Sequence, residues 1–499
     1  MAAQKTKTNV KKRARKTTKS PAKRATKRKS SGGLRVRMYR VGFGDFFLVI
    51  VPTSAGDQHI LIDCGVFKGT SGTGDIGSIV RAVEDMYETT SGHLALVIMT
   101  HRHADHIAGF TKAKEKFQEF TASMVWMPYW EQFNDQEKDS AHSLQADIHE
   151  LAANLALQFR GRKDPDAQEA LAQLANATGI EDFSAAATGK KKGGSNAIAL
   201  DLLKNHLGSD GKNVRYYSAG DKPELPPELK GLKATILGPP PKDAQAFLSL
   251  MDLKKGVGQY LDSMVEEGDD SKPIQPFPKE WSAEVRSYPK VDLRKFPIDY
   301  DKFIEDVNNA QPDMLVAAAA KIENFLNNQS LVVLFEFDGK KLLFAGDAQG
   351  GNWEYWLYKA EGPEKDPTKI GDIAEASKDL LQTIDFYKVG HHGSTNATPV
   401  PAIEAAVGRP KSTKGFVSMC STEPGVYGNP KKESEVPRTR LMEVIGKGSC
   451  LLRSDALPIT FKDADTEKIV TVNAAKGVKL PRIKVGKVSK SKLYLEYSF

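Results

Sequence analysis

The chain has 499 residues, 40% of them hydrophobic, which is typical of a globular protein with two to four domains or one large domain with insertions. No apolar stretch approaches the roughly 18 residues of a membrane-spanning helix, and no apolar segment follows the basic start. Three cysteines are too few for a disulfide framework. We therefore expect a cytoplasmic protein without a membrane anchor or secretory signal.

The positive charge is concentrated at one end of the chain. The first 30 residues contain thirteen Lys and Arg and no Asp or Glu, whereas the other 58 basic residues face 63 acidic ones. Residues 1–33 lack apolar periodicity, which predicts a disordered basic tail. Its expected partner is nucleic acid, bound through counterion release, which would associate the protein with DNA or the nucleoid; a solubilising or targeting tail is the alternative. The cations expected to contact phosphates are Lys11, Lys12, Arg13, Arg15, Lys16, Lys23, Arg24, Lys27, Arg28 and Lys29.

Apolar runs separated by turn-forming residues predict the elements of the first third of the chain. The expected strands are 36–41, 46–51, 59–62, 94–99 and 124–126, and the expected helices are 76–87 and 107–117. The run at 94–99 contains no polar residue, which indicates a buried strand.

The middle of the chain has a different pattern. Ala- and Leu-rich helical periodicity dominates from about 130 to 210, and a polar, Pro-punctuated stretch extends over about 240–325. Strand-like segments at 214–217 and 232–237 lie between them. We therefore expect two mostly helical insertions within a domain that extends over 34–465.

Strands are predicted again in the last third of the chain. The expected strands are 331–337, 341–345, 383–389, 415–419, 449–453 and 459–461. Asp338-Gly339 joins the first two as a typical hairpin turn. The final residues, 466–499, are expected to form a basic β-like extension.

The most informative motif follows the strand at 94–99 and reads Thr-His-Arg-His-Ala-Asp-His, with His101, His103, Asp105 and His106. Imidazole and carboxylate groups are ligands for zinc and manganese. A loop after a strand can present the first two histidines to one metal and the Asp-His pair to a second. Three His and one Asp within six positions make a chance surface cluster a poor explanation.

A second cluster lies far downstream. Asp347 follows the strand at 341–345 and is expected to bridge two metals roughly 3.5–4 Å apart. Two adjacent histidines follow the strand at 383–389, and neighbouring strand residues point to opposite faces, so we expect one of them to be a ligand. We favour His391 as the ligand and His392 as the donor to a substrate oxygen or leaving group; the reverse assignment is the alternative.

Two further aspartates lie beside glycines. Asp63 ends the strand at 59–62, and we expect it to orient a metal ligand or a metal-bound water. Asp45 lies in the turn Gly-Phe-Gly-Asp and has a similar expected role, with a purely turn-forming role as the alternative.

Together these motifs resemble a known family. His-Arg-His-Ala-Asp-His is similar to the H-x-H-x-D-H signature of the metallo-β-lactamase superfamily. The segments VGFGDFFLV, LIDCG, THRHADHIAG, NNQSLVVL, LLFAGD, KVGHHGS and VYGNP more closely resemble the metallo-β-lactamase-like domain of ComEC competence proteins, over about 36–455. The resemblance implies an α/β fold, specifically an αββα sandwich, with two divalent metal ions, zinc or alternatively manganese. It also implies hydrolase chemistry, which for the competence members is nuclease chemistry.

The chain departs from that family at three points. It has no membrane-spanning channel segments, so we do not expect an import pore. The residues around Gly238 include no further His for the first metal, and Asn429 stands where the family has a His. His142, His149 and His206 are alternative ligands, although surface positions on helices explain them better.

The expected nucleophile is a metal-bound hydroxide, because a metal can lower the pKa of water from 15.7 to about 7. Asp105 is expected to orient it, and His392 to protonate the leaving oxygen. The favoured function is hydrolysis of phosphodiesters, as a nuclease or phosphodiesterase, because two cations can clamp the non-bridging oxygens. The alternatives are a hydrolase of small phosphoesters, lactones, thioesters or β-lactams, and a degenerate metal fold that binds nucleic acid or a protein.

Overall fold

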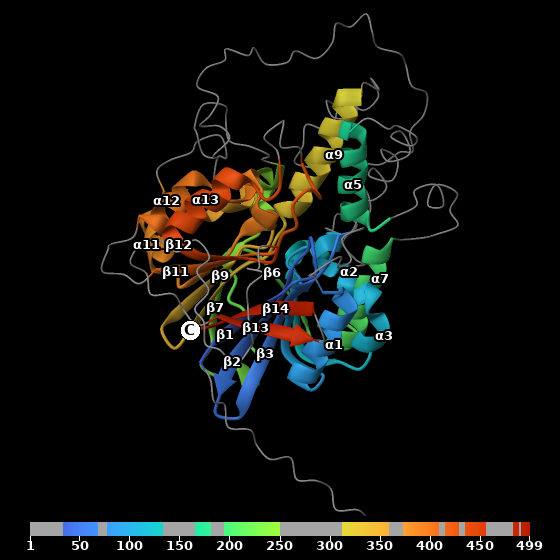
Figure 1. Ribbon diagram of the computed structural model, residues 1–499, viewed down its shortest axis with the longest axis vertical. Coiled ribbons are helices and arrows are strands. Elements are labelled where there is room, and N and C mark those ends of the chain that lie inside the picture. The colour runs from blue at the N-terminus through green and yellow to red at the C-terminus, as the bar shows by residue number, and fades with distance from the viewer. Residues whose placement is uncertain are drawn as a thin grey trace, which may run out of the picture.

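The computed structural model describes residues 33–67, 77–132, 165–180, 194–249, 312–358, 373–408, 415–428, 435–455, 483–488 and 491–499. Within them the chain is mixed α/β, with two mixed β-sheets and helices on the outer side of each (Figure 1). The cations of the basic tail, much of both expected insertions and the expected strand at 459–461 lie outside these residues.

The first sheet has the strand order β13-β14-β1-β2-β3-β4-β5-β6. Its strands are Ile483–Val488 (β13), Ser491–Ser498 (β14), Arg35–Tyr39 (β1), Phe46–Thr53 (β2), Gly56–Cys64 (β3), His93–Ile98 (β4), Thr121–Pro128 (β5) and Val214–Tyr217 (β6). Pairing is antiparallel from β13 to β3 and parallel from β3 to β6. Because β14 pairs with β1 along its length, the C-terminal segment expected as an extension completes the sheet that the N-terminal strand begins.

The second sheet has the strand order β12-β11-β10-β9-β8-β7. Its strands are Ser449–Arg453 (β12), Phe416–Cys420 (β11), Phe386–Lys388 (β10), Lys340–Phe344 (β9), Val332–Phe337 (β8) and Lys233–Gly238 (β7). The strands β9 to β12 are parallel, whereas β7, β8 and β9 are antiparallel. Asp338 and Gly339 form the predicted hairpin turn between β8 and β9, both with positive φ.

The core lies between the two sheets. Alternate residues of β2, namely Phe47, Val49 and Val51, belong to an apolar cluster that also contains side chains of β8 to β12. The rings of Phe47 and Phe344, from opposite sheets, lie 6.1 Å apart. The intervening residues of β2 contact the helices instead, so the strand is buried on both faces, and this explains its uninterrupted apolar sequence.

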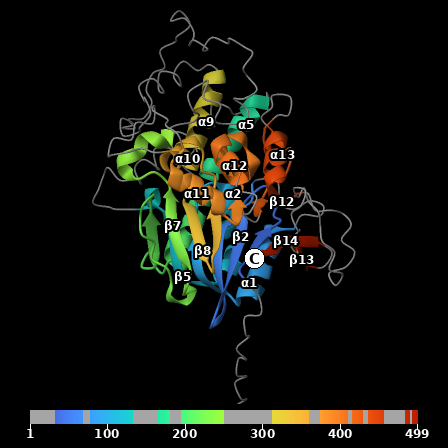
Figure 2. The same ribbon diagram turned by 90° about the vertical axis from the view of Figure 1, so that its left-hand side faces the viewer.

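Helices cover the outer face of each sheet (Figures 1 and 2). On the first sheet these are α1 (Ile79–Thr90), α2 (Ala104–Lys112), α3 (Lys114–Phe117), α7 (Ser195–Asp201) and the π-helix η2 (Leu202–Leu207). On the second they are α10 (Gly350–Leu357), α11 (Glu375–Thr383), α12 (Val400–Val407) and α13 (Thr439–Gly448). The helices α5 (Pro165–Thr178) and α9 (Pro312–Asn327) pack against each other beyond the sheets.

Short 3₁₀ segments complete the described elements: η1 (Tyr129–Glu131), η3 (Pro227–Leu229), the eight-residue η4 (Lys242–Ser249), which is interrupted at Ala244, η7 (Gly390–Gly393) and η8 (Thr395–Ala397). None of the helices in the described part of the chain is long and apolar enough to cross a membrane.

Candidate metal centre

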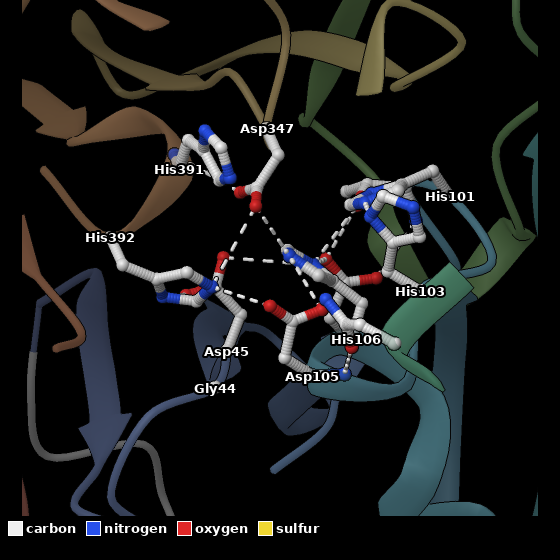
Figure 3. Close-up of polar contacts among 12 residues, drawn as sticks. Gly44, Asp45, His101, His103, Asp105, His106, Asp347, His391 and His392 are labelled. Atoms are coloured by element: carbon white, nitrogen blue, oxygen red, sulfur yellow. Dashed lines mark hydrogen bonds and ion pairs between the residues drawn. The ribbon is translucent and has the colours of Figure 1, made fainter. Parts of the chain in front are cut away.

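The candidate site forms where parallel strands of both sheets end. Asp63 lies near the end of β3, His101 follows β4, Asp347 follows β9 and His392 follows β10. Because parallel strands direct their carboxyl ends to one edge of a sheet, these side chains from distant parts of the sequence meet at one edge of the two packed sheets, and Figure 3 shows His101, Asp347 and His392 among them. The two clusters predicted from the sequence are therefore brought together.

The structure places the first cluster partly in a helix rather than in a loop. Helix α2 begins at Ala104, so Asp105 and His106 lie in its first turn, and His103 is its N-cap residue. The backbone around Asp105 is closely packed: its N–H donates to Asn176 Oδ1 (3.0 Å) and its C=O accepts from the N–H of Asp45 (2.8 Å). A Cβ on Gly65 would lie 2.0 Å from the carbonyl carbon of Asp105, so only glycine fits there.

Three groups of described His and Asp residues could hold a metal ion, and the largest consists of Asp105, His106, Asp347 and His392. The third, Asp45, Asp63 and His106, surrounds His106 Nδ1, which is already hydrogen-bonded to Asp63, so the other two are the candidate ligand groups. His106 Nε2 lies 3.0 Å from Asp347 Oδ2 and 3.9 Å from Asp105 Oδ1. His392 Nε2 lies 3.1 Å from Asp105 Oδ2 and 3.6 Å from Asp347 Oδ2. Four-coordinate zinc with bonds of about 2.0–2.2 Å places neighbouring ligand atoms roughly 3.3–3.6 Å apart, so these separations fit a single ion.

The hydrogen bonding of this group also fits a metal. Oδ1 of Asp105, Nε2 of His106 and Oδ2 of Asp347 are buried and have no hydrogen-bond partner among the residues that the structure describes. Buried polar atoms are normally satisfied, because leaving them without a partner costs about 1–3 kcal/mol each. The buried His and Asp groups could therefore hold metal ions.

A second group consists of His101, His103 and Asp105. His101 Nε2 lies 3.0 Å from His103 Nδ1, and His103 Nε2 is buried without a hydrogen bond. Asp105 belongs to both groups, whereas Asp347, the expected bridge, belongs only to the four-residue group. The carboxylate that links the two candidate positions is thus that of Asp105.

Asp63 lies where it can orient a ligand. Its Oδ2 accepts a hydrogen bond from His106 Nδ1 (2.7 Å) and from the hydroxyl of Thr100 (2.6 Å), and its Oδ1 accepts from the N–H of Thr100 (2.8 Å). A carboxylate on Nδ1 fixes the tautomer of the ring and leaves Nε2 available to a metal. Asp63 has a φ of 54°, a left-handed conformation that Asp tolerates better than most residues.

Asp45 forms an ion pair with Lys388, a residue that the sequence analysis did not identify. The ammonium of Lys388, at the end of β10, contacts Asp45 Oδ2 and donates to Asp347 Oδ1 (3.1 Å) and to the carbonyl of Gly346 (2.8 Å). Lys388 is only 2% exposed. The available signal was a lysine between Phe386-Tyr387 and Val389 in a predicted strand, since a buried Lys requires partners.

The preference for His391 over His392 as ligand is not supported by the geometry. His392 lies in the four-residue group, whereas His391 Nε2 lies 3.5 Å from Glu323 and its Nδ1 lies 3.2 Å from Gln349 Nε2. The strand alternation used to choose between them does not apply, because both residues have left-handed φ values of 45° and 53°. His392 Nδ1 donates to the carbonyl of Ser421 (2.8 Å), which directs Nε2 toward the aspartates.

Burial and neighbouring charges favour neutral His101 and His103 rings and an ionised Asp105. Burial lowers the pKa values of His101 and His103, so both rings can act as neutral ligands. Burial opposes ionisation of Asp105, but His106 and His392 hold its pKa below the usual range. Although burial lowers the pKa of His391, contact with Glu323 raises it to about 9.

His106, like His391, has a raised pKa. Burial lowers its pKa, but the surrounding carboxylates, led by Asp347 and Asp63, raise it well above the usual value. In the metal-free protein its proton therefore compensates the negative charge of the cluster. A metal ion would replace that proton, since a ligating ring must be neutral at Nε2.

The remaining candidates lie elsewhere. Gly238 is the last residue of β7, and Asn352 packs against its Cα. A Cβ at this position would lie 2.0 Å from Asn352 Oδ1, so a histidine could not replace the glycine without a shift of Asn352. His206 Nε2 contacts the carbonyl of Phe117 and is not part of either ligand group. His142, His149 and Asn429 lie outside the described residues.

Comparisons with known proteins identify no relative: no protein-family model matches the chain, and no curated protein matches it. What the structure itself defines is a mixed α/β protein with buried His and Asp groups that could hold metal ions.

Proposed function

We propose that the protein is a metal-dependent hydrolase with the αββα metallo-β-lactamase fold and that its substrates are phosphodiesters. The observation that carries this proposal is the four-residue group, whose nitrogen and oxygen atoms come from three separate segments and converge in the interior. The two facing sheets with helices outside them agree with that fold. Fold and ligand types together favour hydrolysis over electron transfer or purely structural metal binding.

The donor set fits zinc, with manganese as the alternative. Two His and two Asp of the four-residue group would hold one ion, and His101, His103 and the shared Asp105 would hold a second. A bound divalent ion supplies positive charge for the phosphate oxygens and lowers the pKa of water to about 7.

The protein side chains have distinct roles in this proposal. His392 acts as a ligand rather than as the proton donor, because its Nδ1–H is already committed to Ser421. His391 precedes His392 in the chain and belongs to neither ligand group, so it takes the role of donor to a substrate oxygen. Asp105 and Asp347 hold the metals, and Lys388 keeps one oxygen of Asp347 engaged so that Oδ2 faces the metal position.

The proposal is tested by hydrolysis of bis-(p-nitrophenyl) phosphate in the presence of Zn²⁺ or Mn²⁺. We expect turnover by the wild type that is lost in His106→Asn, which removes a ligand of the four-residue group. His93→Asn is the matched control, because His93 is an exposed histidine that contacts Thr121. If the metal-loaded wild type does not hydrolyse the diester but cleaves a β-lactam and a lactone, the protein is a small-molecule hydrolase instead.

The choice between a nuclease and a general phosphodiesterase depends on the basic tail. We propose that residues 1–30 hold nucleic acid near the site through their thirteen cations. Deleting them is expected to slow the hydrolysis of long DNA and to make its rate less sensitive to salt. Turnover of the small diester should not change. Equal effects on both substrates would exclude a nucleic-acid role for the tail in catalysis.

A further inference from the structure

The hydroxyl of Tyr427 is a buried polar atom beside the candidate metal centre that belongs to neither ligand group. This oxygen is buried and has no hydrogen-bond partner among the described residues. The ring of Tyr427 packs on Phe43, with centroids 5.2 Å apart, and on Phe67, at 5.0 Å. Phe43 in turn packs on His392 at 4.2 Å, so Tyr427 is linked to the four-residue group through one aromatic ring.

The backbone fixes the position of this tyrosine. Tyr427 forms an isolated antiparallel bridge with Val436, whose N–H donates to the Tyr427 carbonyl at 3.2 Å. The segment follows β11, which ends at Cys420 beside the site. Since both backbone and ring are held, the hydroxyl has a defined position although it has no hydrogen-bond partner within the described part of the chain.

The surroundings of the hydroxyl are acidic. Besides burial, the carboxylates of Glu323, Asp105 and Glu169 raise the pKa of Tyr427 well above its usual value. The phenol therefore keeps its proton and remains a donor. Asp105 belongs to both ligand groups, and Glu323 lies beside His391, so the hydroxyl is within electrostatic range of the metal positions and of the proposed donor.

A phenol suits this position better than a cationic donor. A lysine or arginine among three carboxylates would form ion pairs with them, as Lys388 does with Asp45 and Asp347. A neutral O–H has no ion pair to break when a ligand arrives, and it can donate to an anionic oxygen whose charge the metals balance.

We propose that Tyr427 is a substrate-binding residue whose O–H donates a hydrogen bond to a non-bridging oxygen of a bound phosphate ester. This inference rests on the proposed function for the class of ligand. The alternative is a structural role, in which the tyrosine serves only as an aromatic ring between Phe43 and Phe67.

The test compares Tyr427→Phe with the wild type, both loaded with zinc, by calorimetric titration with inorganic phosphate. The substitution removes one oxygen and keeps the ring. We expect phosphate to bind about ten- to a hundred-fold more weakly, the effect of losing a hydrogen bond to a charged acceptor. Zinc content is expected to be unchanged, and the melting temperature is expected not to fall, because none of the residues that the structure describes bonds to the lost hydroxyl.

Tyr39→Phe is the matched control. Its hydroxyl donates to Asp85 at 2.8 Å, away from the ligand groups, so we expect a lower melting temperature and unchanged phosphate binding. Equal phosphate affinity in wild type and Tyr427→Phe would overturn the inference, and so would a wild type that binds no phosphate. Turnover of bis-(p-nitrophenyl) phosphate by the same samples reports separately on the proposed function, which stands if the wild type is active whatever the effect of the tyrosine.

Discussion

Replacing Asp63 by Asn should weaken metal binding without removing any ligand. Both carboxylate oxygens of Asp63 accept from donors: Oδ1 from the N–H of Thr100, and Oδ2 from the Thr100 hydroxyl and His106 Nδ1. An asparagine has one NH₂ group, which in either orientation faces a donor and breaks at least one of these bonds. The ring of His106 would lose its anionic partner or its position.

The expected magnitude follows from the role of such partners. Loss of a carboxylate that orients a ligating histidine typically lowers metal affinity ten- to a hundred-fold, or about 1.4–2.7 kcal/mol. We expect this decrease for zinc, measured by competition with a chromophoric chelator at pH 7.5. Circular dichroism of both proteins verifies that the fold is retained.

Asp57→Asn is the matched control, since Asp57 lies on the same strand, pairs with Arg35 and contacts neither ligand group. It should bind zinc as the wild type does. Wild-type zinc affinity in a folded Asp63→Asn protein would refute the reasoning, because the hydrogen bond to His106 would then have no influence on the metal.

Three further predictions concern charge and ligand assignment. Lys388→Met leaves buried carboxylates unpaired and should lower the free energy of unfolding of the metal-free protein by about 3–5 kcal/mol, measured by urea denaturation. Burial lowers the pKa of His59 from 6.5 to about 4, so between these pH values the unfolded chain binds a proton that the folded protein does not. Stability therefore falls as the pH drops from 6.5 toward 4. His59→Gln should reduce this decrease, measured as the change in melting temperature with pH. His392→Asn should lose zinc, whereas His391→Asn should keep its zinc and lose turnover of the small diester; the opposite result would restore His391 as the ligand.

The first His cluster could be predicted from the sequence because its residues are close together in the chain. An apolar run predicts the buried strand β4, and ligand-type residues that follow such a strand emerge at a sheet edge. The hairpin between β8 and β9 was predicted for a similarly local reason, the Asp-Gly turn.

Other features depend on backbone conformation that the sequence does not display. The left-handed φ values of His391 and His392 invalidate the alternation used to choose between them. The start of α2 at Ala104 was also missed, because His103 is not a usual capping residue and makes no side-chain cap.

Contacts between distant segments were the hardest to predict. Lys388 meets Asp45 across 343 residues of sequence, and Tyr427 reaches the site through Phe43. The pairing of β14 with β1 is similarly long-range, and nothing in the composition of the C-terminal segment specifies its partner strand.

The most direct test of the metal centre is the zinc content of the reconstituted protein, measured by elemental analysis after removal of loosely bound ions. The two ligand groups predict about two zinc ions per chain in the wild type, and about one in each of His101→Ala/His103→Ala and His106→Ala/Asp347→Ala, because each double substitution leaves the other group's remaining ligands in place. A folded wild-type protein that retains no divalent metal after reconstitution would contradict the proposal that these buried groups form a metal centre.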